Sequence, residues 1–143
     1  MEIKLDAGDM AKCFSAKANS TLNEKWVSEL INRICDMFAD DIRKGFDIQP
    51  MWVAAYALHM FRRVEQSTNV IALACFVIAM KMLDDDAEEN ASEYTKQMST
   101  LSTKDLVEAE LYVFRQLNFN AHYSSSRVKE TLRDAASKAG VTI

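Results

Sequence analysis

The sequence predicts one all-α domain, and three observations support that prediction. Its 143 residues include only 3 glycines and 1 proline, too few to supply the turns of a protein built from many short strands. The hydrophobic fraction of 49% is enough for a substantial core at this length. Apolar side chains also recur at helical spacing through most of the chain. We therefore expect a bundle of helices with short connections.

Two helices are expected before Pro50. A short one over residues 9–18 places Met10 and Phe14 on one face. A long amphipathic one follows the segment TLNE, residues 21–24, which has the form of a capping box because the threonine hydroxyl and the glutamate carboxylate can bind free backbone N–H groups. Its apolar residues keep the i, i+4 spacing up to Gly45, the expected stop.

The next two helices form the middle of the bundle. Pro50 occupies the first-turn position that proline favours, and MWVAAYALHMFRRV continues that helix. Ser67 or Thr68 can cap the following helix, NVIALACFVIAMKML, residues 69–83. Because this segment is apolar around its whole circumference, other elements must enclose it. We expect it to be the central helix.

Three further helices are expected in the second half of the chain, each marked by a polar capping residue at its start. The expected starts are Asn90 or Ser92, Ser102, and Ser125 or Ser126, and the expected ends are Met98, Leu117 and Gly140.

The composition narrows the class of partner. The formal net charge is -4, whereas proteins that neutralise nucleic-acid phosphates show basic patches, so no nucleic-acid partner is expected. The apolar run from Val70 to Leu83 holds 14 residues, one of them a lysine, and is short of the ~20 that a membrane-spanning helix needs. No membrane span is expected.

The cysteines and the N-terminus indicate the compartment. Cys13, Cys35 and Cys75 are odd in number and widely spaced, which is typical of buried thiols in a reducing compartment rather than of disulfides or a zinc site. The start, MEIKLDAGDMAK, has no basic segment followed by an apolar run and so does not read as a signal peptide. Both observations favour the cytoplasm, the nucleus or both.

No cluster of residues predicts catalysis, a metal or a cofactor. The run Asp84, Asp85 and Asp86 lacks the glycine and the alternating ligands of a calcium loop and reads as a solvated helix end. His59 and His122 lie in different elements, without metal-ligand spacing or a nearby nucleophile arrangement. His59 is expected on a helix surface. We expect a chain that is not an enzyme and holds no cofactor.

Two charged residues occupy positions that should be apolar. On a helical wheel Glu110 falls inside the apolar arc of its helix, between Leu117 and Phe114, and Lys81 follows Ile78 on an apolar rod. A charge there is costly unless it is paired or hydrogen-bonded. Either the two charges form an internal bridge, or both stand at the rim of an exposed apolar groove and await backbone groups of a partner.

Three segments in order, YALHMFRRV, ALACFVIAMKMLDD and LSTKDLVEAELYVFRQLNFN, resemble the cyclin box of the cyclins. The resemblance covers roughly residues 22–121 and looks most like the short P/U-type cyclins of phosphate signalling. It implies a five-helix box over residues 21–121. Residues 1–20 then form an N-terminal segment with the short helix, and residues 122–143 add one C-terminal helix.

The resemblance also implies a function: a regulatory subunit that binds and allosterically activates a cyclin-dependent protein kinase. In that family the third and fifth helices form an apolar groove for the kinase C-helix, and a lysine and a glutamate bind the kinase backbone. These match Lys81 and Glu110, which favours the groove interpretation, although the two charges can still bridge each other in the free protein. The other implied kinase-contact residues are Ile78, Met82, Phe114, Phe119, Asp84 and Asp85.

The chain departs from the cyclin pattern in two places. The segment INRICDMF stands where mitotic cyclins carry a methionine-arginine-alanine-isoleucine-leucine motif, so the basis for docking short substrate motifs is absent although Arg33 is present. Ala121, smaller than the family residue, trims the groove and points to a different kinase subtype. The alternative function is a cyclin-fold or other helical adaptor that does not activate a kinase.

Overall fold

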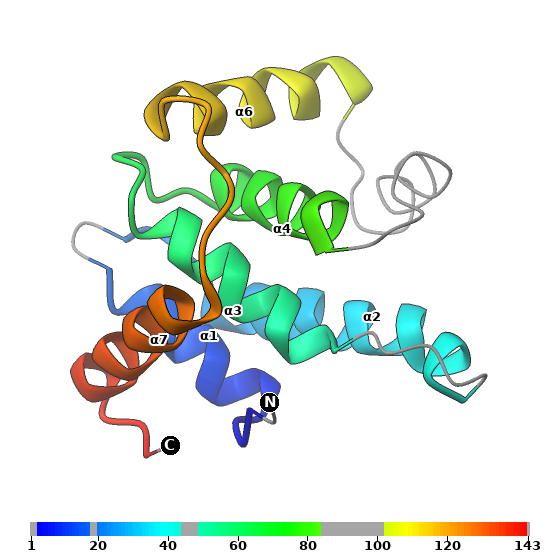
Figure 1. Ribbon diagram of the computed structural model, residues 1–143, viewed down its shortest axis with the longest axis vertical. Helices are drawn as coiled ribbons and strands as arrows, with labels where there is room; N and C mark the ends of the chain where they lie inside the picture. Colours follow the sequence, from blue (N-terminus) through cyan, green and yellow to red (C-terminus); the bar gives the residue numbers. More distant parts are fainter. Residues whose placement is uncertain (1–2, 18–19, 44–48, 84–101, 143) are drawn as a thin grey trace.

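The computed structural model describes residues 3–17, 20–43, 49–83 and 102–142, and all regular structure in these ranges is helical. In chain order the helices are α1 (Ala7–Ser15), α2 (Glu24–Arg43), α3 (Pro50–Phe61), α4 (Asn69–Leu83), α6 (Thr103–Gln116) and α7 (Ser125–Ala139). α6 lies at one edge of the bundle with α4 beneath it, and α1 and α7 lie at the opposite edge (Figure 1). The all-α prediction is confirmed.

Side-chain caps set where the first two helices begin. The Asp6 carboxylate accepts a first-turn N–H at 2.8 Å, so α1 begins two residues earlier than predicted. α2 begins behind Asn23, whose Oδ1 accepts the Trp26 N–H at 3.2 Å. The predicted cap at Thr21 is therefore wrong. Its hydroxyl donates instead to the Ser67 carbonyl at 3.2 Å, because the segment before α2 packs against the loop before α4.

Helix α4 fills the centre of the bundle. The Thr68 hydroxyl accepts the Ile71 N–H at 3.3 Å, which selects Thr68 from the two predicted caps. Every residue of α4 from Ile71 to Met80 is buried, with α3 and α6 packed against it. Phe76 stacks on Phe14 of α1 with 5.1 Å between ring centroids. The predicted central position of this helix is confirmed.

The remaining helix ends follow local chemistry closely. Pro50 begins α3 and Ser102 caps α6, both as predicted, the serine accepting the Asp105 N–H at 3.1 Å. The cap of α7 is Ser124, one residue before the predicted pair. Gly140 follows α7 with φ 72°, a left-handed conformation that glycine adopts without a Cβ clash. The predicted Gly45 stop and the helix predicted to end at residue 98 lie outside the described residues.

His59 joins α3 to α7 inside the bundle. Its side chain is fully buried, its Nδ1 lies 2.8 Å from the Thr131 hydroxyl of α7, and its ring meets Tyr123 with centroids 4.3 Å apart. Burial, together with the nearby positive charges of Arg63 and Arg127, lowers the pKa of His59 to about 4. The predicted surface position was wrong because α7 returns from the C-terminal end of the chain and covers this face of α3.

Lys17 secures the C-terminal end of α3 from the segment behind α1. Its Nζ donates to the carbonyls of Phe61 at 2.7 Å, of Gln66 at 3.1 Å and of Val64, and it lies 4.3 Å from the centroid of the Phe61 ring. These carbonyls sit where a helix end leaves acceptors without partners. Burial lowers the pKa of Lys17. One cation therefore satisfies the helix end and the loop behind it.

The cysteines differ in burial. Cys13 and Cys75 are buried, as predicted, and burial raises the pKa of their thiols to about 11 and about 12. Cys35 is only half-buried, so the prediction was wrong for this residue, which α2 presents near its surface. All three are free thiols. No helix in the described part of the chain has the length and apolar character that crossing a membrane requires.

Candidate partner-binding site

The apolar arc of α6 is divided between the core and the surface. Leu106 and Val113 are buried against the bundle. On the neighbouring edge of the same arc Val107 is 53% exposed and Leu111 39%, and Phe114 is half-buried. Val107, Leu111 and Phe114 follow i, i+4, i+7 spacing and so share one face of the helix. We call these three residues the α6 stripe.

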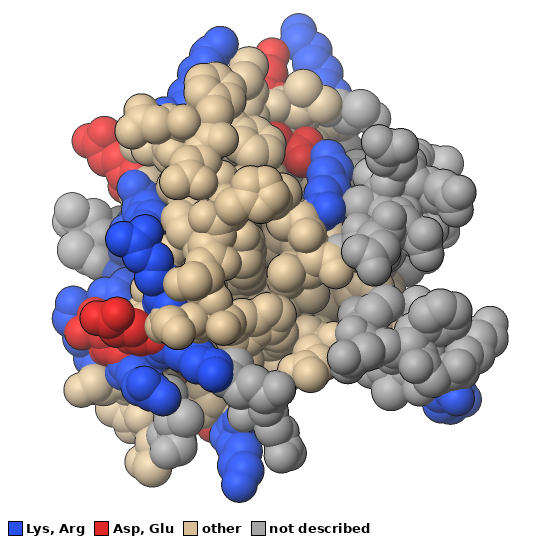
Figure 2. Space-filling model, in the orientation of Figure 1, with Lys and Arg blue, Asp and Glu red and all other residues tan. Residues whose placement is uncertain are grey.

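Charged side chains are sparse on one face of the bundle. Figure 2 shows this face, where uncharged residues extend over α6 and α4 and down toward α3, with most of the charged side chains around the margin. Apolar side chains that recur along one helix face and remain exposed are typical of an interaction surface rather than of single scattered surface residues. The stripe is therefore a candidate contact surface.

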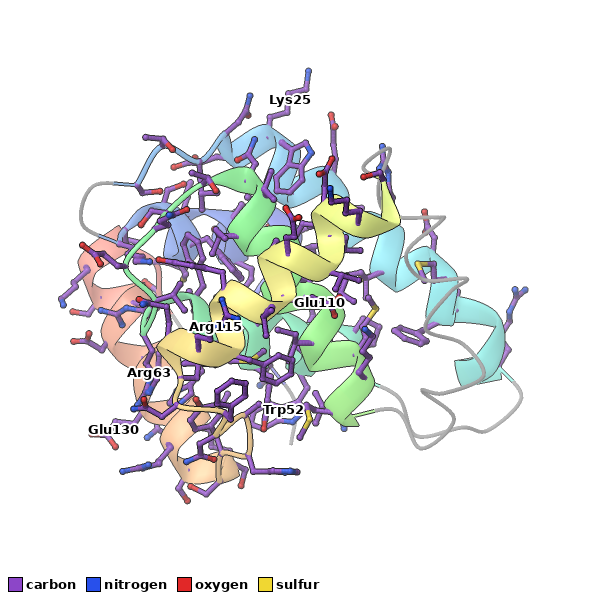
Figure 3. The ribbon with its side chains drawn as sticks, turned by 90° about the horizontal axis from the view of Figure 1, so that it is seen from above. Lys25, Trp52, Arg63, Glu110, Arg115 and Glu130 are labelled. Atoms are coloured by element: carbon purple, nitrogen blue, oxygen red, sulfur yellow. The ribbon has the colours of Figure 1, made fainter. Side chains whose placement is uncertain are left out.

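Glu110 and Lys81 pair beside this stripe. The Lys81 Nζ lies 2.7 Å from Glu110 Oε1, and Figure 3 shows Glu110 projecting from α6 toward the end of α4. The Lys81 side chain is 39% exposed and that of Glu110 only 10%. Pairing explains how a carboxylate is tolerated on this face. In the free chain the two charges thus bridge each other, one of the two arrangements that the sequence left open.

The predicted apolar contact residues fall at different depths. Ile78 is 1% exposed, so a partner cannot touch it without a rearrangement of the bundle, because α4 is buried at every position from Ile71 to Met80. Met82 in the last turn of α4 and Phe114 in α6 are half-buried and pack against the core. Ile78 therefore packs beneath the surface without being part of it, whereas Met82 and Phe114 can form part of the surface.

Phe119 is the most exposed large apolar residue in the described part of the chain, at 68%. It has φ 59° and follows Asn118 with φ 53°, and its N–H donates to the Phe114 carbonyl at 2.7 Å. Bulky residues rarely adopt this left-handed conformation, which costs roughly 1–2 kcal/mol. Backbone strain of this kind is concentrated at functional sites. An exposed aromatic residue held in a strained turn fits an anchor for a partner.

Two of the predicted contact residues cannot be placed, and two exposed residues of α6 were not predicted. Asp84 and Asp85 lie outside the described residues. Val107 and Leu111 lie on the apolar arc of the helical wheel but are not among the predicted contact residues. A helical wheel identifies the arc, yet its covered side depends on which neighbours pack against α6. Only the positions of the other helices supply that information.

The arrangement is suited to binding. It offers apolar area on α6, an exposed aromatic residue and one charge of each sign whose hydrogen-bonding groups can turn to a partner backbone. Among the residues that the structure describes, no group of three or more histidine, cysteine, aspartate or glutamate side chains is placed to hold a metal ion. No protein-family model, curated protein or solved structure matches this chain.

Proposed function

We propose that this protein is a cyclin-type regulatory subunit that binds and allosterically activates a cyclin-dependent protein kinase through α4 and α6. The observation that carries the proposal is the exposed α6 stripe beside the Lys81–Glu110 pair. Glu110 lies three residues after Val107 and four before Phe114, so charge and apolar contact fall on one helix face. The order of the sequence motifs, which resembles that of the cyclin box, supports this partner class.

The partner element would be an amphipathic helix of the kinase. A helix lays its apolar side chains against an apolar surface of matching spacing, here the α6 stripe with Met82 and Phe119 at its borders. Its backbone groups would compete with the internal pair, Lys81 donating to a kinase carbonyl and Glu110 accepting a kinase N–H. Lys81 is already part-exposed, so it can turn outward at low cost.

Activation in this proposal needs no chemistry from the chain. A protein kinase is active only when the glutamate of its C-helix pairs with the lysine of its third strand. A rigid surface that binds the C-helix in that position favours the active state by its differential affinity. α4 is enclosed by α3 and α6, and this rigidity suits such a role.

The sharpest test uses a charge exchange. We expect Glu110→Lys to abolish co-purification with a cyclin-dependent kinase and activation of that kinase, and Lys81→Glu to weaken both. The double variant Lys81→Glu/Glu110→Lys restores an internal pair and hence the thermal midpoint, but presents the wrong groups to the kinase backbone. Stability should therefore recover while kinase binding does not.

Glu108→Lys is the matched control because this exposed glutamate lies on the other face of α6. It should bind and activate like the unaltered chain. Recovery of kinase binding in the double variant would show that Lys81 and Glu110 stabilise the fold and do not contact the kinase, contrary to the proposal. Partner capture that is indifferent to Glu110→Lys and Phe119→Ala supports the alternative, a helical adaptor that does not activate a kinase.

A further inference from the structure

A polar pocket lies between the end of α3 and one face of α7, away from the α6 stripe. It has a volume of about 510 Å³. Its lining is entirely polar and consists of Arg62, Arg63, Arg127, Glu130, Thr131 and Asp134. Figure 3 shows Arg63 and Glu130 projecting on the same side of the molecule from these two elements.

Arg62 and α7 build the wall of this pocket. The four lining residues of α7 follow i, i+3, i+4, i+7 spacing and so share one helix face. Arg62 binds this face twice, donating to Asp134 at 2.8 Å and to the Thr131 carbonyl at 3.2 Å. Lys138 also reaches Asp134, at 3.3 Å. The charge of Asp134 is thus already shared between two cations.

Arg63 and Arg127 have no ion-pair partner of this kind. Within the described residues neither guanidinium lies within salt-bridge distance of a carboxylate. Arg63 donates to the His59 carbonyl at 3.3 Å and lies 5.4 Å from the centroid of the Tyr123 ring. Burial lowers the pKa of Arg63, and the positive charges of Arg127 and Arg62 lower it further. Two cations without an ion-pair partner therefore converge on one pocket, which Glu130 also lines, in a chain of net charge -4.

We propose that this pocket binds the phosphate group of a phosphoserine or phosphothreonine side chain in a partner peptide. A phosphorylated side chain carries a charge of about -1.5 to -2 at neutral pH and three strong acceptor oxygens. It matches two guanidinium groups, whereas a carboxylate supplies one charge. Guanidinium groups bind phosphate oxygens in pairs, and clusters of arginine are the usual means of phosphopeptide recognition.

The shape of the pocket favours a peptide over a nucleotide or a free ion. A volume of this size lies within the range of pockets that hold molecules rather than single ions. None of its lining residues is aromatic, so the lining offers no ring on which a base could stack. The pocket does not require kinase binding, because it lies between the end of α3 and one face of α7 and includes none of the proposed kinase contacts.

Fluorescence polarisation with two labelled peptide libraries tests the proposal. The libraries are random nonapeptides with a central phosphoserine or, in the matched library, a central serine. We expect the unaltered chain to bind the phosphoserine library and to bind the serine library at least tenfold more weakly. Arg127→Gln should weaken phosphopeptide binding by roughly tenfold or more, since charge-assisted hydrogen bonds from a guanidinium to phosphate are stronger than those between neutral groups. Arg63→Gln should do the same.

Arg133→Gln is the matched control, because this exposed arginine of α7 does not line the pocket. It should leave phosphopeptide affinity unchanged. The thermal midpoint of each variant shows that it folds, and the comparison of the two libraries on the unaltered chain requires no variant. Equal affinity for the two libraries overturns the proposal, as does an Arg127→Gln variant that binds like the control.

Two further measurements identify the molecule that carries the phosphate. Inorganic phosphate should displace the peptide only at much higher concentration than an unlabelled phosphopeptide pool does. Vesicles of phosphatidylcholine with phosphatidylinositol bisphosphate should not retain the protein. Inorganic phosphate as effective as the peptide pool, or retention on the vesicles that Arg127→Gln abolishes, overturns the assignment to a peptide.

Discussion

Helices α4 and α6 are both rich in apolar residues, pack against each other and share the Lys81–Glu110 pair, yet they use their apolar side chains differently. α4 is buried at every position from Ile71 to Met80. α6 buries one side of its arc and leaves Val107 and Leu111 exposed. The difference follows from position, since α4 lies inside the bundle and α6 at its edge (Figure 1). The same kind of residue forms the core in one helix and a binding surface in the other.

The largest effect should come from truncating an aromatic residue of α4. Phe76→Ala removes a fully buried ring that stacks on Phe14 and should lower the free energy of unfolding by about 3–5 kcal/mol. Val107→Ala on α6 should change it by no more than about 0.5 kcal/mol, because that side chain is half in solvent. Urea denaturation measures both. A similar loss in the two variants would show that α6 is covered as completely as α4.

A pH effect of comparable size is expected where α3 meets α7. The folded-state pKa of His59 is about 4, against an ordinary value of 6.5, so the unfolded chain takes up the proton first as the pH falls. The contribution to stability is complete above pH 6.5 and is lost between pH 6.5 and 4, by ~3 kcal/mol.

Urea denaturation between pH 4.5 and 7.5 measures this loss. Carboxylates titrate in the lower part of the same range, so His59→Gln serves as the reference that lacks the histidine proton. The unaltered chain should lose more stability than the variant as the pH falls. Parallel curves would show that His59 is solvated in the folded state, contrary to its burial beneath α7.

A smaller change of opposite sign is expected at the end of α6. Phe119→Gly places glycine where φ is 59° and should raise the free energy of unfolding by about 0.5–1 kcal/mol, because the left-handed conformation no longer strains a bulky residue. The same variant should lose kinase binding under the proposed function. A loss of stability instead would mean that the ring packs within the fold.

The smallest stability effect is expected for the ion pair itself. Glu110→Gln removes the charge but leaves Lys81 part-exposed to water, so the free energy of unfolding should fall by less than about 1 kcal/mol. Glu108→Gln, on the solvated face, should have no measurable effect. A loss of several kcal/mol for Glu110→Gln would show that the pair is part of the core, and the pair could then not open to bind a partner.

Much of the fold could be predicted from local patterns. Pro50, Thr68 and Ser102 lie at the helix starts where their chemistry favours them, and the unbroken apolar run of α4 predicted enclosure. One error arose where a residue had two uses for its side chain. Thr21 could have capped α2 but bonds to Ser67, a residue far along the chain that local pattern reading cannot see.

The candidate site could be predicted only in part, because some of its features are local and others depend on how the helices pack. Glu110 and Lys81 were identified because a charge on an apolar face is anomalous by itself. Whether the two charges meet depends on how α6 packs on α4, and the burial of Ile78 depends on how α3 and α6 cover α4. The convergence of Arg63 and Arg127 had no signal in the sequence, since it arises only when α7 returns to the end of α3.

The sequence by itself determined the helical class, the central place of residues 69–83 and the two misplaced charges, because periodicity, capping chemistry and the cost of burying charge are local. Only the tertiary structure decided which side of α6 stays exposed, that His59 is buried beneath α7, and where Arg63 and Arg127 meet. These properties depend on contacts between segments distant in the chain, and burial is a property of the assembled bundle rather than of any one helix.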